Sequence, residues 1–115
     1  MISVEIPMVP PSINHYYIQT GKRKVIGEKG LEFRALVAYL VPYANILKTD
    51  RLAFTALIHW ADRRKRDLDN AMKCLIDAFA IAVGFDDCQI DELHVYRVPF
   101  VKGQRAFVNV KIEVL

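Results

Sequence analysis

Apolar and polar residues alternate at the start of the chain and then give way to a polar, aromatic stretch. Residues 2–8 carry an apolar side chain at every second position, the spacing of a half-buried β-strand. Pro10 and Pro11 should end this strand, because proline has no backbone N–H to donate to a sheet. Residues 12–27 surround a turn signal at Gly21, so we expect an exposed loop or a short hairpin there.

Helical spacing and strand spacing then alternate along the middle of the chain. Apolar positions between residues 30 and 44 lie on one helical face, and Pro42 should kink or end this helix. Residues 51–60 are apolar on both sides, which favours a central strand. Residues 68–83 again follow helical spacing and are followed by Gly84, so the sequence predicts a second helix that ends there.

The last part of the chain predicts two strands, near residues 93–100 and 105–114. Because the segment between them carries Gly103, we interpret them as an antiparallel hairpin. The order of elements predicts an α+β fold, with a small mixed or antiparallel sheet and two main helices. A chain of 115 residues is long enough for one core, so residues 1–115 should form a single domain.

Composition excludes several classes of protein. Hydrophobic residues make up 53% of the chain and charged residues 25%, which fits neither disorder nor a fibre. No apolar run approaches the roughly 18 residues of a membrane span, and the start does not resemble a signal peptide, so we expect a cytoplasmic protein without a membrane partner. Cys74 and Cys88 are too few for a zinc or disulfide framework and should be reduced.

Charge is sorted into blocks along the chain, although the net charge is only +3. An acidic stretch contains Asp86, Asp87, Asp91 and Glu92. A basic stretch contains Arg63, Arg64, Lys65 and Arg66. Basic residues gathered in this way indicate an anionic partner.

The basic stretch runs directly into a pair of carboxylates at the junction of a strand and a helix. Asp67 in the entering loop and Asp69 in the first turn can point the same way there. Paired carboxylates can hold Mg²⁺, and Lys73 one turn further can offset charge that develops on a phosphoryl group. The pattern therefore predicts phosphodiester hydrolysis.

Simpler interpretations of the same residues stay open. Asp67 or Asp69 can serve only as an N-cap, Lys73 only as the i+4 partner of Asp69, and residues 63–66 only as a solvated loop. The main rival function is a nucleic-acid-binding module that grips phosphates without cleaving them. A second rival is a nuclease that prefers flaps, single strands or RNA.

Four motifs of this sequence resemble the RusA family of Holliday junction resolvases. The string RRKRDLDNAMK is similar to the arginine-rich signature of that family, and GFDDCQI is similar to its acid-pair segment. PPSINHYY and residues 96–114 resemble its early motif and its closing hairpin. The motifs are spread over nearly the whole chain in the order that the family has.

The resemblance implies an activity, a cofactor and an assembly. It implies a Mg²⁺-dependent endodeoxyribonuclease, with Mn²⁺ as an alternative ion, that binds four-way DNA junctions. It implies symmetric paired nicks in recombination and repair, made by an intertwined homodimer in the bacterial cytoplasm, with a prophage as one origin of the gene.

The resemblance also assigns roles to individual residues. It implies that Asp67, Asp69 and Asp87 are catalytic metal ligands, with Asp86 as the alternative to Asp87, and that Lys73 is the catalytic lysine. The expected DNA-binding residues are Arg63, Arg64, Lys65, Arg66, Asn14 and Tyr17. For Tyr17, as for Tyr16, core packing or a dimer contact is an equal alternative to base stacking.

The predicted helix places the carboxylates far apart within one chain. A helix over residues 69–83 separates its ends by about 20 Å, whereas the four residues to Asp87 can return at most about 13 Å. We therefore expect the acid pair either to fold sharply back or to complete a site of the other subunit.

Overall fold

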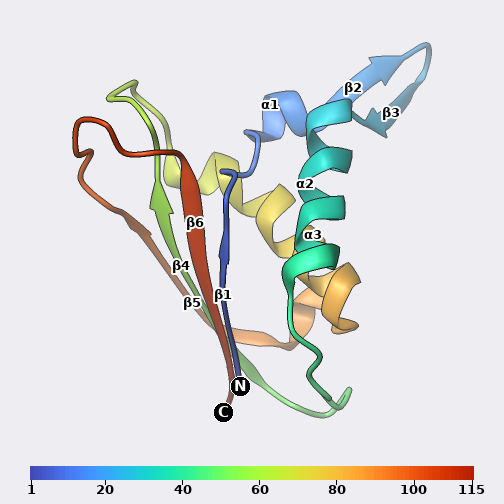
Figure 1. The fold of residues 1–115 in the computed structure, drawn as a ribbon. Coiled ribbons are helices and arrows are strands. Elements are labelled where there is room, and N and C mark those ends of the chain that lie inside the picture. Colours follow the sequence, from blue (N-terminus) through green and yellow to red (C-terminus); the bar gives the residue numbers. More distant parts are fainter.

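One mixed sheet carries the fold, with its four strands in the order β1–β6–β4–β5. The computed structural model describes all residues 1–115 (Figure 1). The strands are β1 (Ile2–Ile6), β4 (Leu52–His59), β5 (Ile90–Arg97) and β6 (Phe107–Val114). β6 pairs antiparallel with both β1 and β4, whereas β5 pairs parallel with β4. The predicted α+β class and the central position of β4 are confirmed.

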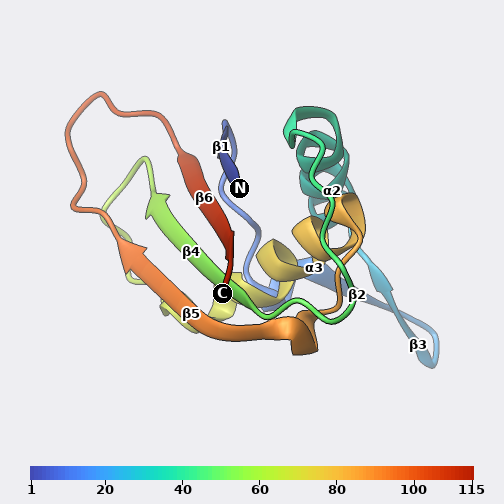
Figure 2. The same cartoon turned by 90° about the horizontal axis from the view of Figure 1, so that it is seen from below.

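Two helices cover one face of this sheet and leave the other face open (Figure 2). They are α2 (Glu28–Leu40) and α3 (Met72–Val83). α2 ends before Pro42, as predicted, because proline cannot continue the helical hydrogen bonds. α3 ends at Gly84, whose φ of 93° is accessible to glycine at little cost, and this end is also as predicted.

Short elements connect these parts. The expected hairpin consists of β2 (Tyr17–Thr20) and β3 (Arg23–Ile26), and it projects from the upper end of the molecule in Figure 1. The one-turn helix α1 (Ile13–Tyr16) precedes it, and the sequence pattern did not predict that turn. The 3₁₀ turns are η1 (Leu68–Ala71), which leads into α3, and η2 (Asp87–Gln89), which leads into β5.

The core lies between the helices and the covered face of the sheet. Phe54 and Ile58 of β4 are fully buried, as are Leu75 and Phe79 of α3. The rings of Phe54 and Phe79 meet edge to face with 5.8 Å between their centroids. This packing fixes α3 against the centre of the sheet, and with it the position of every side chain on α3.

The predicted antiparallel hairpin of residues 93–100 and 105–114 is wrong. β5 and β6 do not pair with each other, because β4 lies between them. β5 follows α3, and a helical crossover of this kind returns the chain parallel to the strand it left. The connection over residues 98–106 then crosses the end of β4, so that β6 pairs on its other side.

A buried glutamine holds the turn after α3 in place. Gln89 is 4% exposed, and its Nε2 donates to the carbonyl oxygens of Leu47 and Asp50, at 3.0 and 2.9 Å. Its Oε1 accepts a hydrogen bond from the Asp86 backbone N–H at 3.0 Å. These bonds attach η2, and so the acid pair, to the loop between α2 and β4.

Two further expectations concern the cysteines and the membrane. Both cysteines are free thiols, and burial raises the pKa of Cys74 to about 12. None of the helices has the length and apolar character required to span a membrane.

Candidate active site

The basic stretch follows β4 and is held by the last of its four residues. Arg66 donates to both carboxylate oxygens of Asp62, at 2.5 and 3.0 Å, and its guanidinium lies 5.3 Å from the Trp60 ring centroid. Arg97 of β5 donates to the Arg66 carbonyl oxygen. The hydrogen bonds from Arg66 are the main reason that the pKa of Asp62 falls to about 2. Arg66 therefore anchors the loop through contacts inside the protein.

The other basic side chains of the loop are more available. The Arg63 guanidinium stacks 5.0 Å from the Phe100 ring centroid, so its contact reaches the loop between β5 and β6. The Arg64 side chain is 81% exposed, and Lys65 is also exposed. Arg64 and Lys65 are thus the members of the stretch that present their charge to solvent.

A cleft of about 700 Å³ lies beside this loop, between η1 and the segment that leads into α1. The loop lines one side of it with Arg64, Lys65 and Asp67. Asn14 and His15 line the other side. The structure therefore brings the predicted DNA-binding residue Asn14 to the same cavity as the basic stretch and the first predicted carboxylate.

Asp67 and Asp69 neither make a capping hydrogen bond nor pair with Lys73 in the structure. Asp67 occupies the N-cap position of η1, but its side chain makes no capping hydrogen bond, and the N-cap of α3 is Ala71. Lys73 does not pair with Asp69; its Nζ lies 3.3 Å from Oδ1 of Asp77. Asp67 and Asp69 are both exposed. Their oxygens are therefore available to a ligand.

Lys73 is paired with Asp77 one turn later on α3. The charge of Asp77 is the largest cause of a raised pKa of Lys73, and the hydrogen bond that Lys73 donates to this carboxylate adds to it. The negative charge of Asp87 makes a smaller contribution in the same direction.

The acid pair folds back along α3, as one of the two expected arrangements requires. Asp86 and Asp87 share a small hollow with Asp77, in the middle of the helix. Asp67 lines the other cavity, beside the basic loop. No three His, Cys, Asp or Glu side chains of the protomer lie close enough to form a metal cluster. The structure thus brings Asp87 to the same hollow as Asp77 but does not gather Asp67, Asp69 and Asp87 into one cluster.

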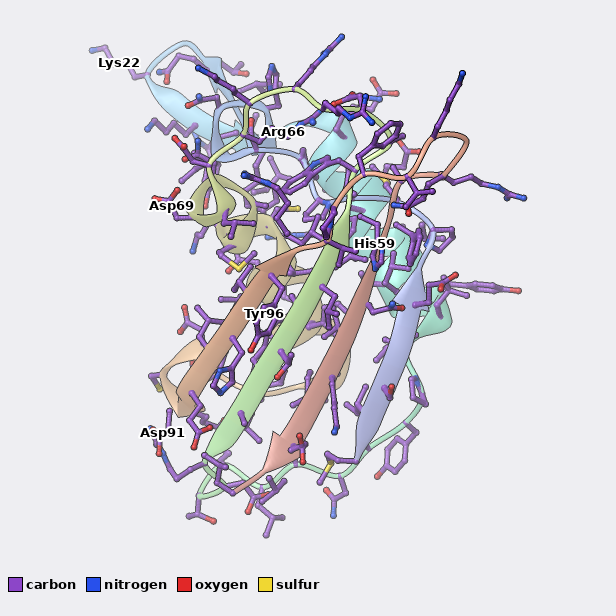
Figure 3. All side chains as sticks on the ribbon, turned by 90° about the vertical axis from the view of Figure 1, so that its left-hand side faces the viewer. Lys22, His59, Arg66, Asp69, Asp91 and Tyr96 are labelled. Atoms are coloured by element: carbon purple, nitrogen blue, oxygen red, sulfur yellow. The ribbon has the colours of Figure 1, made fainter.

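The donor set nevertheless fits a hard divalent cation. Asp67, Asp69 and Asp87 offer carboxylate oxygens, the ligands that Mg²⁺ prefers, and none of these residues forms an ion pair in the protomer. Figure 3 shows Asp69 and Arg66 at the same end of the molecule as Lys22 of the hairpin, with Asp91 at the opposite end. Asp91 instead pairs with Arg51, which lowers its pKa.

Sequence reasoning missed Asp77 and Arg34 as neighbours of the site. Asp77 stands one turn after Lys73 and two turns after Asp69, so helical spacing carried a signal for it. Arg34 reaches the site through Tyr16 from α2, and nothing in its local sequence marks it. His15 lines the cleft although no partner was visible at a regular spacing.

Comparison with known proteins identifies relatives over most of the chain. Residues 7–113 match the family described as endodeoxyribonuclease RusA. A crossover junction endodeoxyribonuclease of enterobacteria phage HK97 is 34% identical over 105 residues, which cover 88% of this chain and 87% of the relative. The protein of that name from Escherichia coli K12 is 37% identical over 109 residues, which cover 90% of this chain and 88% of the relative. That of phage 82 is 38% identical over 102 residues, covering 84% and 82%. The chain belongs to the RusA family of endodeoxyribonucleases.

Proposed function

We propose that this chain is a Mg²⁺-dependent endodeoxyribonuclease that binds four-way DNA junctions and resolves them by symmetric paired nicks. Its role would lie in DNA recombination and repair, in the cytoplasm of a bacterium or as a prophage product. Family membership supports this class of activity, since the relatives are named crossover junction endodeoxyribonucleases. Residues 1–115 act as one catalytic domain.

The observation that carries the proposal is that the two carboxylates just before α3 have no partner within the protein. Asp67 makes no capping hydrogen bond with its side chain, and neither Asp67 nor Asp69 forms an ion pair, although both stand beside four basic residues. Asp62 of the same loop, in contrast, pairs with Arg66. Free carboxylates beside a basic cleft favour a site that holds a cation near a phosphate.

Asp67, Asp69 and Asp87 would hold the ion, which is Mg²⁺, with Mn²⁺ as an alternative. A bound divalent cation supplies Lewis acidity toward a phosphoryl oxygen and lowers the pKa of water in its coordination shell. Lys73 is protonated at neutral pH, like an ordinary lysine, and Asp77 raises its pKa further. It therefore carries positive charge toward the phosphoryl group in the transition state.

The remaining site residues bind and orient the DNA. Arg64 and Lys65 contact phosphates from the loop, with Arg63 beside them and Arg66 as the anchor. Asn14 faces them across the cleft, and Tyr17 stands near Lys73. Phosphate contacts of this kind position the backbone without reading sequence, which suits a protein that recognises the shape of a junction.

The active form is a homodimer. A four-way junction offers two equivalent strands to cut, and an isologous dimer presents two equivalent sites related by the same twofold symmetry. Paired nicks in opposing strands follow from that match of symmetry.

The substitution Asp69→Asn tests the catalytic assignment. It removes one ligand charge, so we expect nicking of a four-way junction to fall by about 100-fold or more. Junction affinity in the presence of a chelator should stay equal or rise, because a negative charge near phosphate has been removed. Gel-shift titration and single-turnover cleavage measure the two quantities separately.

Glu32→Gln is the matched control for Asp69→Asn. It removes the same charge from an exposed position on α2, outside the site. The control should nick like the wild type. Equal nicking by Asp69→Asn and the wild type would overturn the catalytic assignment of Asp69. Absence of nicking by both proteins, with junction binding intact, would leave a DNA-binding module.

A further inference from the structure

A chain of polar contacts reaches Lys73 from the interior of the protein. Arg34 of α2 donates to the Tyr16 hydroxyl oxygen from Nη2 at 2.6 Å and from Nε at 3.0 Å. The same hydroxyl donates to Oδ2 of Asp77 at 3.1 Å. Oδ1 of Asp77 then lies 3.3 Å from the Lys73 ammonium nitrogen. Three helices, α1, α2 and α3, contribute to this network.

The direction of each hydrogen bond is fixed by the groups themselves. A guanidinium has only donors, so the Tyr16 oxygen must accept from Arg34. The single hydroxyl proton of Tyr16 is then left for Asp77, which is an acceptor when ionised. Because Tyr16 holds one oxygen of the Asp77 carboxylate, the other oxygen is turned toward Lys73.

This arrangement differs from an ordinary surface ion pair one helical turn apart. Such pairs join two mobile side chains and contribute little. Here the Tyr16 side chain is fully buried, and the Asp77 side chain is only 18% exposed. Burial raises the pKa of Tyr16 to about 12, so the hydroxyl keeps its proton at any pH at which the protein works. The Asp77 carboxylate that contacts Lys73 is therefore held in place by a hydrogen bond from a buried side chain.

The close packing of α2 on Tyr16 maintains the network. A Cβ at Gly30 would lie 2.6 Å from Cδ1 of Tyr16, so only glycine allows α2 to approach the ring this closely. The Arg34 guanidinium also lies 5.5 Å from the ring centroid, above the face of the same tyrosine. Neither the ring nor its hydroxyl has room to change place.

We propose that Tyr16 and Asp77, with Arg34 behind them, are positioning residues that hold the Lys73 ammonium group in its catalytic place. The inference rests on the proposed role of Lys73 in junction nicking. Asp77 and Tyr16 act through the lysine and do not touch the DNA. Both Asp77 oxygens are engaged, by Tyr16 and by Lys73, and the inference gives Asp77 a positioning role and no role as a metal ligand.

The isosteric variant Tyr16→Phe tests the inference, because it removes one hydroxyl and keeps the buried ring. We expect the single-turnover nicking rate of the Mg²⁺-loaded protein to fall about 10- to 100-fold, since a misplaced charge loses much of its effect. Junction affinity and the Mg²⁺ concentration for half-maximal rate should change less than about twofold. Tyr39→Phe, an exposed tyrosine of α2 without a hydrogen bond, is the control and should nick at the wild-type rate.

A double-mutant cycle with Lys73→Gln shows whether the hydroxyl acts through the lysine. Adding Tyr16→Phe to Lys73→Gln should slow nicking no further, because the group it positions is gone. A wild-type rate for Tyr16→Phe, or the same fold loss in both backgrounds, would overturn the inference while the proposed function stands. Asp77→Asn should leave the Mg²⁺ concentration for half-maximal rate unchanged. A shift in that concentration would identify Asp77 as a metal ligand and overturn the positioning role. A wild-type rate for Lys73→Gln would instead refute the role of Lys73.

Discussion

Lys65 and Arg66 are neighbours in the sequence, but the structure gives them different roles. Lys65 is exposed at the cleft, whereas Arg66 is bonded to Asp62 and stacked near Trp60. We expect Lys65→Gln to weaken binding to junctions of every sequence, because one phosphate contact is lost. The slope of log K for junction binding against log salt concentration should become shallower by about 1. Thermal stability should not change.

Arg66→Gln is the matched comparison, because it should lower thermal stability and change the salt dependence of junction binding less than Lys65→Gln does. It removes the contacts that hold the loop, so we expect a lower Tm than for Lys65→Gln. Thermal melts and gel-shift titrations over a range of salt concentrations measure both quantities. A Tm that falls equally in both variants would show that Arg66 does not anchor the loop.

Asp62 makes the stability of this loop depend on pH. Its pKa falls from 3.8 to about 2 because Arg66 and the Arg64 backbone N–H donate to its charged form. A carboxylate with a lowered pKa stabilises the fold above its unfolded value and loses that effect as pH falls through the folded value. The Tm difference between wild type and Asp62→Asn should therefore be constant above about pH 5 and shrink between about pH 4 and pH 2. A difference that stays constant down to pH 2 would contradict this.

At the scale of residues, the sequence revealed charge but not its partners. The order RRKRDLD marked this segment as a block of charge, because such blocks are visible in one dimension. It could not show that Arg97 donates to the Arg66 carbonyl oxygen, since Arg97 comes from a strand far along the chain. The same holds for Tyr16, whose partners Arg34 and Asp77 lie on two other elements.

At the scale of elements, the contact between α2 and Tyr16 gives a test of the packing. Gly30→Ala places a methyl group 2.6 Å from the Tyr16 ring and 2.9 Å from Cγ2 of Ile26. Overpacking of this kind costs about 1–3 kcal/mol, more than the 0.5–1 kcal/mol that alanine contributes in a helix. We therefore expect a lower midpoint in urea unfolding. A more stable variant would show that α2 is not fixed against the tyrosine.

Element positions followed from the sequence more closely than their pairing did. Hydrophobic spacing predicted both long helices, the first strand and the central strand, because spacing is a local property. The turn signal at Gly21 predicted a loop or a short hairpin, and the structure has the hairpin. The pairing of β5 was wrong because the turn signal at Gly103 favoured a hairpin. The crossover through α3 decides the direction of β5, and that is a property of the whole sheet.

At the scale of the whole molecule, the two arrangements of the acid pair predict different behaviour of mixed dimers. Asp87 shares a hollow with Asp77 of its own chain, so we expect each protomer to hold its own site. A heterodimer of Asp69→Asn and Asp87→Asn, purified through two different tags, should then fail to nick a junction. Restored nicking would show that Asp87 completes the site of the other subunit, and light scattering that finds only monomers would contradict the dimer itself.

The candidate site was predictable in part at this scale. The motifs identified Asp67, Asp69 and Lys73 together, because they stand within two turns of one helix start. The place of Asp87 was not predictable, since it depends on Gln89, which ties η2 to the loop before β4. Helix length alone allowed two arrangements. The structure turns Asp87 back toward Asp77 but leaves it apart from Asp67, so both arrangements remain predictions.

The most direct test of the account is cleavage of a four-way junction and of a plain duplex with the same sequence. Each substrate is incubated with the wild-type protein in Mg²⁺ and in chelator. The account predicts paired nicks at symmetric positions in opposing strands of the junction, only when Mg²⁺ is present, and no cutting of the duplex. An uncut junction, cutting that survives the chelator, or equal cutting of the duplex would contradict it.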